Sequence, residues 1–250
     1  PAPVGPLVVP GVPGDDPAVV ASGATVPDAS TGADALAILE QYAITPSKAV
    51  RAALSDPALA APTPADPRLR NNQTFVIATA QQALAAAAAA ARAAGVAPLI
   101  LSSSLEGEAR EVAIVHAGIA RQVVQHAQPL AAPCVILSGG ELTVTIRGQG
   151  RGGPNQEYAL ALAIALDGMP AVAALAGDTD GTDGGAGSAA DPAGAFVDGG
   201  TAARGKALGL DPAAFLSQNN STGFFEALGD LLVPGPTFTN VNDFRALLIV

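Results

Sequence analysis

The sequence predicts an α/β fold with a twisted, mostly parallel or mixed sheet that carries helices on its faces. From residue 75 onward, short apolar runs of strand length alternate with longer segments of helical periodicity. The chain has 250 residues, of which 49% are hydrophobic, so it can bury a sizeable core. Aromatic residues make up only 4%, and alanine and glycine are abundant. We therefore expect helices and sheet to pack through the close approach of small side chains.

The first part of the chain is rich in Pro, Gly and Asp, which indicates long loops around few regular elements. We expect a short strand at 7–9, a helix that starts near Thr31 and ends before Pro46, and a second helix at 47–54. A Pro-rich linker follows at 61–67. The predicted domains are therefore 1–65 and 66–250.

After the linker, periodicity and turn residues assign the remaining elements in order. The Gly139-Gly140 pair favours a tight turn between two strands, the second of which would run antiparallel to the first. The alternating pattern of that second strand indicates one wetter face. The expected strands are 75–78, 98–101, 134–137, 142–146, 171–175 and 246–250, and the expected helices are 80–94, 108–126, 154–166 and 224–228.

Charge and composition narrow the function classes. A formal net charge of −10 argues against nucleic acid or an anionic membrane as a partner. No apolar run approaches the roughly 20 residues that span a bilayer. The single cysteine, Cys134, fits a reducing compartment, so we predict a cytoplasmic protein. The chain starts with Pro1 rather than methionine, and we expect it to be part of a longer or processed polypeptide.

The most informative segment is the stretch 147–153, which combines two arginines with four glycines and contains no acid. Gly148, Gly150, Gly152 and Gly153 can adopt positive φ and let the backbone approach a ligand, while the arginines supply charge and forked donors. Pro154 suits the first turn of a helix, whose free N–H groups would add to the attraction for an anion. We favour a phosphate or carboxylate site; a dinucleotide fingerprint (Gly148-x-Gly150-x-x-Gly153) and a purely structural turn are the alternatives.

Two polar loops offer oxygen ligands. The segment 177–184 contains Asp178, Asp180 and Asp183 directly after a predicted strand, where α/β folds bind ligands. These carboxylates could hold Mg²⁺ against a phosphate or accept a proton from a hydroxyl, with a calcium loop or a solvated acidic turn as alternatives. The loop 235–243 ends in Asn242-Asp243, which could equally cap turns.

Several motifs in order resemble one family. The segments Ser138-Gly139-Gly140-Glu141, 150–157, 179–184 and 235–243, with 14–17 and 22–28 upstream, resemble the class II glycerate kinases, or MOFRL family. Members of this family are often named hydroxypyruvate reductases. The likeness covers essentially the whole chain.

The resemblance implies ATP-dependent phosphorylation of D-glycerate to 2-phosphoglycerate, with ATP and Mg²⁺ as cofactors, glycerate as the small-molecule partner, and a homodimer as an assembly to consider. It implies a three-layer twisted mixed sheet with helices on both faces, preceded by a remnant of a Rossmann-like N-terminal domain. Arg151 matches an active-site arginine, and Asp180 or Asp183 an active-site aspartate. The site residues expected are Arg151, Asp180 and Asp183 as catalytic groups, Ser138, Gly139, Gly140, Glu141, Arg147, Gly150, Asn155, Asn240 and Asn242 as groups that bind substrate or phosphate, and Asp178 as a metal ligand.

The sequence departs from the family pattern in two main respects, besides smaller changes at Ala24, Asn220 and Phe238. Family members carry Ser-Asp where this chain has Pro10-Gly11, which removes a carboxylate. The nucleotide loops and active-site lysine of the family would precede Pro1, so we expect this chain to supply the C-terminal half of a cleft and to be inactive alone. An NAD(P)-dependent hydroxypyruvate reductase and a catalytically silent binding subunit are the alternatives.

Overall fold

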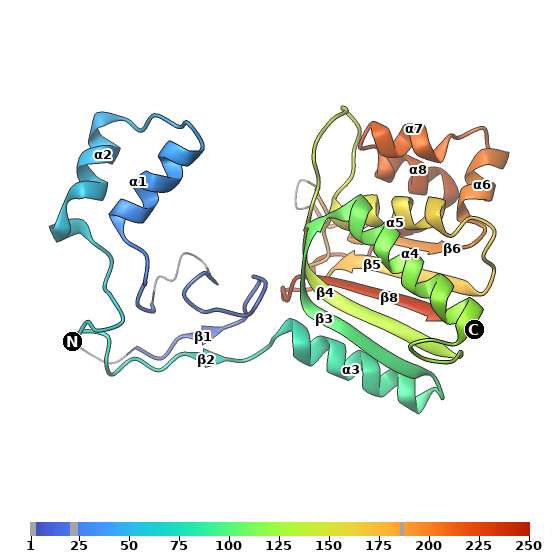
Figure 1. The fold of residues 1–250 in the computed structure, drawn as a ribbon, viewed down its shortest axis with the longest axis horizontal. Coiled ribbons are helices and arrows are strands. Elements are labelled where there is room, and N and C mark those ends of the chain that lie inside the picture. Colours follow the sequence, from blue (N-terminus) through green and yellow to red (C-terminus); the bar gives the residue numbers. More distant parts are fainter. Residues whose placement is uncertain (1–3, 21–24, 186–187) are drawn as a thin grey trace. The chain divides into compact units, whose positions relative to one another are not determined.

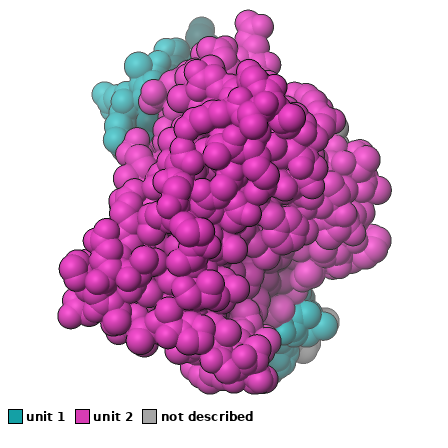
Figure 2. Space-filling model, turned by 90° about the vertical axis from the view of Figure 1, so that its right-hand side faces the viewer, with its two compact units in different colours: residues 1–8, 16–77 teal, residues 9–15, 78–250 magenta. Residues whose placement is uncertain are grey.

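The computed structural model describes residues 4–20, 25–185 and 188–250, so residues 22–24 of the upstream motif lie outside the described residues. The chain forms two compact units, Pro1–Val8 with Asp16–Ile77 and Val9–Asp15 with Ala78–Val250. Figure 1 traces the chain through both units and Figure 2 marks each in its own colour. The sequence-based domain division at 65/66 stays a prediction.

The first unit contains the two helices that the sequence predicts. Helix α1 (Gly32–Gln41) begins with a reciprocal capping box between Thr31 and Asp34, and α2 (Lys48–Ser55) begins at Ser47, whose hydroxyl accepts from the backbone of the first turn. A short 3₁₀ helix, η2 (Pro57–Leu59), follows α2. The strands β1 (Leu7–Val8) and β2 (Phe75–Val76) pair in parallel.

The second unit is built around a six-stranded sheet of order β3-β4-β8-β5-β6-β7. Strands β3 and β4 are parallel, whereas β8 runs antiparallel to both β4 and β5, and β6 and β7 continue the antiparallel pairing. The predicted mixed α/β sheet is thus confirmed. The strand bounds are β3 (Ala97–Glu108), β4 (Cys134–Thr143), β5 (Val172–Asp178), β6 (Gly194–Asp198), β7 (Leu231–Leu232) and β8 (Asp243–Ile249).

Helices cover both faces of this sheet (Figure 1). Alternate residues of a strand point to opposite faces. Accordingly, Val135 and Leu137 of β4 pack with Leu84 of α3 (Ala80–Ala93), whereas Cys134 and Ile136 join the larger core under α4 (Ala109–His126) and α5 (Pro154–Ala165). Strand β4 is therefore buried on both sides, whereas Ala173 of β5 and Leu248 of β8 are exposed.

Small residues allow the helices to approach each other closely, as the composition predicts. The buried stripe of α4 consists of alanines spaced three or four residues apart, which lie on one face of a helix. They belong to the same core cluster as the inward face of α5. The fully buried alanines of α4 are Ala109, Ala113, Ala117 and Ala120.

One predicted turn is wrong. The segments expected as two strands, 134–137 and 142–146, are not joined by a hairpin: one strand, β4, runs without a break from Cys134 to Thr143 with Gly139-Gly140 inside it, and residues 144–146 lie outside any strand. Gly140 has φ +109° and faces the backbone of Leu105 in β3, so close that a Cβ could not fit. The glycine pair therefore serves a close strand approach beside the register shifts of β3, rather than a hairpin.

The region between residues 184 and 223 holds elements that the sequence pattern did not reveal. These elements are strand β6 and the helices α6 (Thr201–Ala207) and α7 (Pro212–Ser217). They are so short that a hydrophobic periodicity cannot be recognised in their sequences. Helix α8 (Ser221–Leu228) starts three residues before its predicted beginning at 224. Across the described residues, no helix is both long and apolar enough to cross a membrane.

Candidate functional site

The sheet topology gathers the predicted acidic groups at one edge. Because β8 runs antiparallel between β4 and β5, the ends of β4 and β5 meet the start of β8 there. Asp243 of β8 is in register with Gly140 of β4 on one side and with Asp178 of β5 on the other. Glu141 follows Gly140 and reaches the same edge, which we call the acidic edge.

The loop after β5 is held by its own side chains. Asp178 accepts a hydrogen bond from the backbone N–H of Asp180 at 2.9 Å, and Asp180 accepts one from the backbone N–H of Thr182 at 2.9 Å. The second oxygen of Asp180 accepts from the side-chain amide of Asn240 at 3.1 Å. The structure thus brings the predicted residues Asp178, Asp180 and Asn240 together.

Burial, more than the nearby negative charges, raises the pKa of two carboxyl groups at the acidic edge. Partial burial of the carboxyl group, followed by the charge of Asp243, raises the pKa of Glu141 to about 7, although the residue as a whole is exposed. Burial likewise raises the pKa of Asp178. A carboxylate with a pKa near neutrality is suited to exchange a proton with a substrate hydroxyl.

The described residues give weak support for a resident metal. Among residues 4–20, 25–185 and 188–250, no group of three or more His, Cys, Asp or Glu side chains could hold an ion. Mg²⁺ is commonly bound through one or two carboxylates together with substrate phosphates. The acidic edge fits that mode better than an all-protein site, and the assignment of Asp178 as a ligand stays a prediction.

Asn242 has a left-handed backbone conformation at the acidic edge. It has φ +65°, its side chain is 2% exposed, and its Oδ1 atom is buried without a hydrogen-bond partner in the described residues. A Cβ on Gly11 would lie 3.5 Å from that atom and 3.4 Å from Oδ1 of Asn240. Gly11 therefore faces the side-chain amides of Asn240 and Asn242.

A fully buried ion pair in β8 contributes to the acidic edge. Arg245 is 0% exposed, pairs with Asp243, and stacks its guanidinium 5.4 Å from the ring centre of Tyr158. Asp243 also accepts from the side chain of Asn155 at 2.5 Å and from the backbone of Leu142 at 3.2 Å. Sequence reasoning missed Arg245; its signal is the presence of two charges, at 243 and 245, on one face of an otherwise apolar strand.

Asp183 caps helix α5. Its carboxylate accepts from the backbone N–H groups of Asn155 at 3.0 Å and Gln156 at 2.8 Å. The expectation that these N–H groups are free for a phosphate is therefore wrong, because the protein's own carboxylate occupies them. Burial raises the pKa of Asp183 to about 6, against the opposing effect of these hydrogen bonds. The catalytic assignment of Asp183 and the substrate-binding assignment of Asn155 stay predictions.

The glycines of residues 144–153, which we call the arginine loop, have a different role from the one expected. None of Gly148, Gly150, Gly152 and Gly153 has positive φ. Instead, a Cβ on Gly148 or Gly150 would overlap the backbone of residues 218–220, and one on Gly153 would overlap Asp183. These glycines let the loop lie directly against its neighbours.

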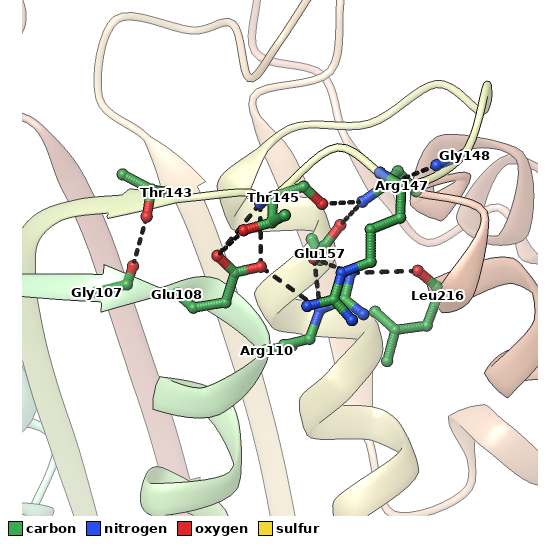
Figure 3. Close-up of polar contacts among 10 residues, drawn as sticks. Gly107, Glu108, Arg110, Thr143, Thr145, Arg147, Gly148, Glu157 and Leu216 are labelled. Carbon is green, nitrogen blue, oxygen red and sulfur yellow. Dashed lines mark hydrogen bonds and ion pairs between the residues drawn. The ribbon is translucent and has the colours of Figure 1, made fainter. Parts of the chain in front are cut away.

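The loop displays its two arginines differently. The side chain of Arg151 is 69% exposed and forms an ion pair of 2.7 Å with Glu226 of α8. The side chain of Arg147 is exposed, but its backbone is held in place, because the backbone N–H donates to Oδ1 of Asn219 at 2.7 Å (Figure 3). The remaining predicted residues Ser138 and Gly139 are buried within β4, and Ser138 Oγ has no partner in the described part of the chain.

The fold and the site define an α/β domain with an acidic sheet edge and a separate cationic loop. Comparison with known proteins identifies the family to which this chain belongs. The model of the MOFRL family matches residues 134–243, and that of a domain of unknown function (DUF4147) matches residues 1–55. The glycerate kinase of Macaca fascicularis is 33% identical over 295 residues, covering 100% of this chain and 73% of that protein. The chain belongs to the class II glycerate kinase (MOFRL) family.

Other relatives are longer than this chain. The D-glycerate 2-kinase of Thermotoga maritima is 41% identical over 100% of this chain, which spans 57% of that protein. A crystal structure of glycerate kinase from the same organism superposes with a TM-score of 0.86, covering 100% of this chain and 58% of the other. A protein of Agrobacterium vitis, provisionally named a hydroxypyruvate reductase, is 48% identical over 97% of this chain and is spanned for 54% of its length.

Proposed function

We propose that this chain supplies the C-terminal half of the cleft of a glycerate 2-kinase, which transfers the γ-phosphoryl group of ATP to the 2-hydroxyl of D-glycerate. The observation that carries the proposal is the likeness to the T. maritima kinase along the entire chain, at 41% identity and a TM-score of 0.86. In the reaction, an O–P bond forms to the 2-hydroxyl oxygen, the bond to ADP breaks, and the hydroxyl proton leaves.

Residues of the acidic edge and of the arginine loop could perform the individual steps of that reaction. A carboxylate of the acidic edge, Asp180 or Glu141, would orient the hydroxyl and accept its proton. Arg151 and Arg147 would neutralise charge on the transferring phosphoryl group or on the carboxylate of glycerate. ATP would enter with Mg²⁺ as a substrate, and Asp178 would share that ion with the phosphates.

The geometry disfavours the alternative of a nicotinamide-dependent reductase. In a dinucleotide fingerprint, the glycines admit the pyrophosphate to the N-terminus of the following helix. Here the carboxylate of Asp183 occupies that helix terminus, Gly148 and Gly150 pack against residues 218–220, and Gly153 packs against Asp183. A pyrophosphate at that position would displace a buried, hydrogen-bonded carboxylate.

The test uses the 250-residue chain alone and the same chain fused behind the part of the T. maritima kinase that it does not cover. ADP formation from ATP and D-glycerate is followed in one coupled assay, and oxidation of NADH or NADPH by hydroxypyruvate in another. We expect ADP formation by the fusion only. Hydroxypyruvate-dependent loss of NAD(P)H without ADP formation would favour the reductase. Inactivity in both assays would favour a silent binding subunit. A homodimer and a cytoplasmic location remain part of the proposal.

A further inference from the structure

Asn219 occupies a special position between α7 and α8. It is 8% exposed and has φ +52°, a left-handed conformation that asparagine tolerates better than most residues. This conformation follows directly on the last residues of α7 and turns the chain toward α8. Its side chain thereby contacts the arginine loop, which is distant from Asn219 in the sequence.

The side-chain amide of Asn219 uses all of its hydrogen-bonding capacity. Its Oδ1 atom accepts from the backbone N–H groups of Arg147 at 2.7 Å and Gly148 at 2.9 Å. Its Nδ2 atom donates to Oε2 of Glu157 at 2.8 Å and to the carbonyl oxygen of Thr145 at 3.3 Å. Because the two ends of the amide face opposite partners, the amide is fixed in one orientation.

Glu157 sets that orientation. Its side chain is 2% exposed, and its Oε1 atom accepts from Nη2 of Arg110 at 2.6 Å and Nε at 2.9 Å, while its other oxygen accepts from Asn219. Glu108 accepts a hydrogen bond from the backbone N–H of Thr145, a further residue of the arginine loop, at 3.0 Å (Figure 3). Arg110 thus neutralises a buried carboxylate that is free to accept only, which forces Asn219 to present its oxygen to the loop.

We infer that Asn219, oriented by Glu157 and Arg110, is a positioning residue that fixes the arginine loop and thereby the places from which Arg147 and Arg151 act on a bound anion. The catalytic consequence rests on the proposed kinase function, whereas the anchoring of the loop does not. The network joins α4, α5 and the α7–α8 turn to the loop, so it holds the loop against the body of the domain rather than against itself.

The test is a reciprocal exchange of the two buried partners. Asn219→Asp keeps the acceptor for Arg147 and Gly148 but sets a second carboxylate against Glu157. Glu157→Gln replaces one of the two acceptor oxygens by an NH2 group. In either orientation of the new amide, this donor faces another donor, Arg110 or Nδ2 of Asn219, so the orientation of Asn219 loses its support. Combining the two changes restores complementary partners, because the new amide can accept from Arg110 and donate to the new carboxylate; only the contact with Thr145 stays lost. Gln218→Glu, an exposed neighbour with the same change of charge, is the control.

Amide hydrogen exchange at Arg147 and Gly148 in the 250-residue chain is the first measurement. We expect exchange to be about tenfold faster in each single variant, on the scale of one lost hydrogen bond, and to return within about threefold of the parent in the double variant. The control should match the parent. If a single variant fails to fold, recovery of cooperative melting in the double variant supports the coupling. Unchanged exchange in both single variants, or a double variant no better than they are, would overturn the inference.

Kinetics of the fused enzyme is the second measurement. Each single variant should lower kcat/KM by about 10²-fold, mainly through kcat, with recovery in the double variant. Faster exchange combined with unchanged kinetics would reduce the residue to a purely structural role and overturn the inference. An inactive parent fusion would count against the proposed kinase function, and the exchange data would still decide whether Asn219 holds the loop.

Discussion

Asp183 accepts a hydrogen bond from the backbone N–H of Gln156, 27 residues earlier in the chain, at 2.8 Å. The same carboxylate accepts from the next N–H toward the helix N-terminus. The helix terminus that the motif suggests as an anion site is therefore already occupied by a carboxylate of the protein, supplied by another segment of the chain. This relationship divides the carboxylates of the loop after β5: Asp183 caps α5, while Asp178 and Asp180 lie at the acidic edge. The catalytic assignment of Asp183 stays a prediction.

Removal of this cap should destabilise the domain. We expect Asp183→Ala to lower the free energy of unfolding by about 2–4 kcal/mol, because it leaves buried N–H groups of α5 without acceptors. Urea unfolding followed by circular dichroism measures the change. Asp211→Ala, which removes the exposed cap of α7, should cost about 1 kcal/mol or less. Equal, small losses in both variants would contradict a capping role for Asp183.

The close approach of the arginine loop can be tested at one glycine. A Cβ at Gly150 would overlap the backbone and Cβ of Asn220, so Gly150→Ala should destabilise the chain by roughly 1–3 kcal/mol. Gly118→Ala is the matched control, because this exposed position in α4 has nothing within 4 Å of the added atom. There alanine should stabilise by roughly 0.5–1 kcal/mol through its helix propensity. A stabilising effect at both positions would show that the loop does not lie against Asn220.

The protonation of Glu141 should appear in the pH dependence of stability. Its pKa in the folded chain, about 7, lies above the ordinary value of 4.5, so the folded state binds more protons between these pH values. Its favourable contribution is therefore complete at low pH and is lost as pH rises through 7. Urea midpoints should be lower at pH 8 than at pH 5.5, and Glu141→Gln should flatten that difference. Glu111→Gln, an exposed change on α4, should leave the slope as it is; an unaltered slope in Glu141→Gln would refute the prediction.

The role of Arg151 depends on the proposed kinase function. In the fused enzyme, Arg151→Ala should lower kcat/KM by about 10²-fold or more, the scale of one strong transition-state charge contact. Its ion pair with Glu226 is exposed, with 69% and 60% of the side chains accessible, so stability should change by less than about 1 kcal/mol. Arg204→Ala, which removes another exposed ion-paired arginine, should change kcat/KM little. Equal, small kinetic effects of the two substitutions would assign the loop a structural role.

The sequence alone was sufficient for the class of fold and for most helices. Helix α5 begins at Pro154, as predicted, because a proline in the first turn is a signal that needs no distant partner. The same local reasoning correctly placed the core strand that starts at Cys134. The family resemblance rested on short motifs whose residues are contiguous and can be read directly.

Only the tertiary structure decided what those motifs touch. Gly139-Gly140 looks like a turn in isolation, but the neighbouring strand β3 makes it part of one continuous strand. The glycines of the arginine loop, the cap by Asp183 and the anchor at Asn219 all depend on partners 27 to 74 residues away. The physical reason is that propensity and periodicity describe a segment and its nearest neighbours, whereas a buried hydrogen bond or a close backbone approach is defined by whichever segment the fold brings against it.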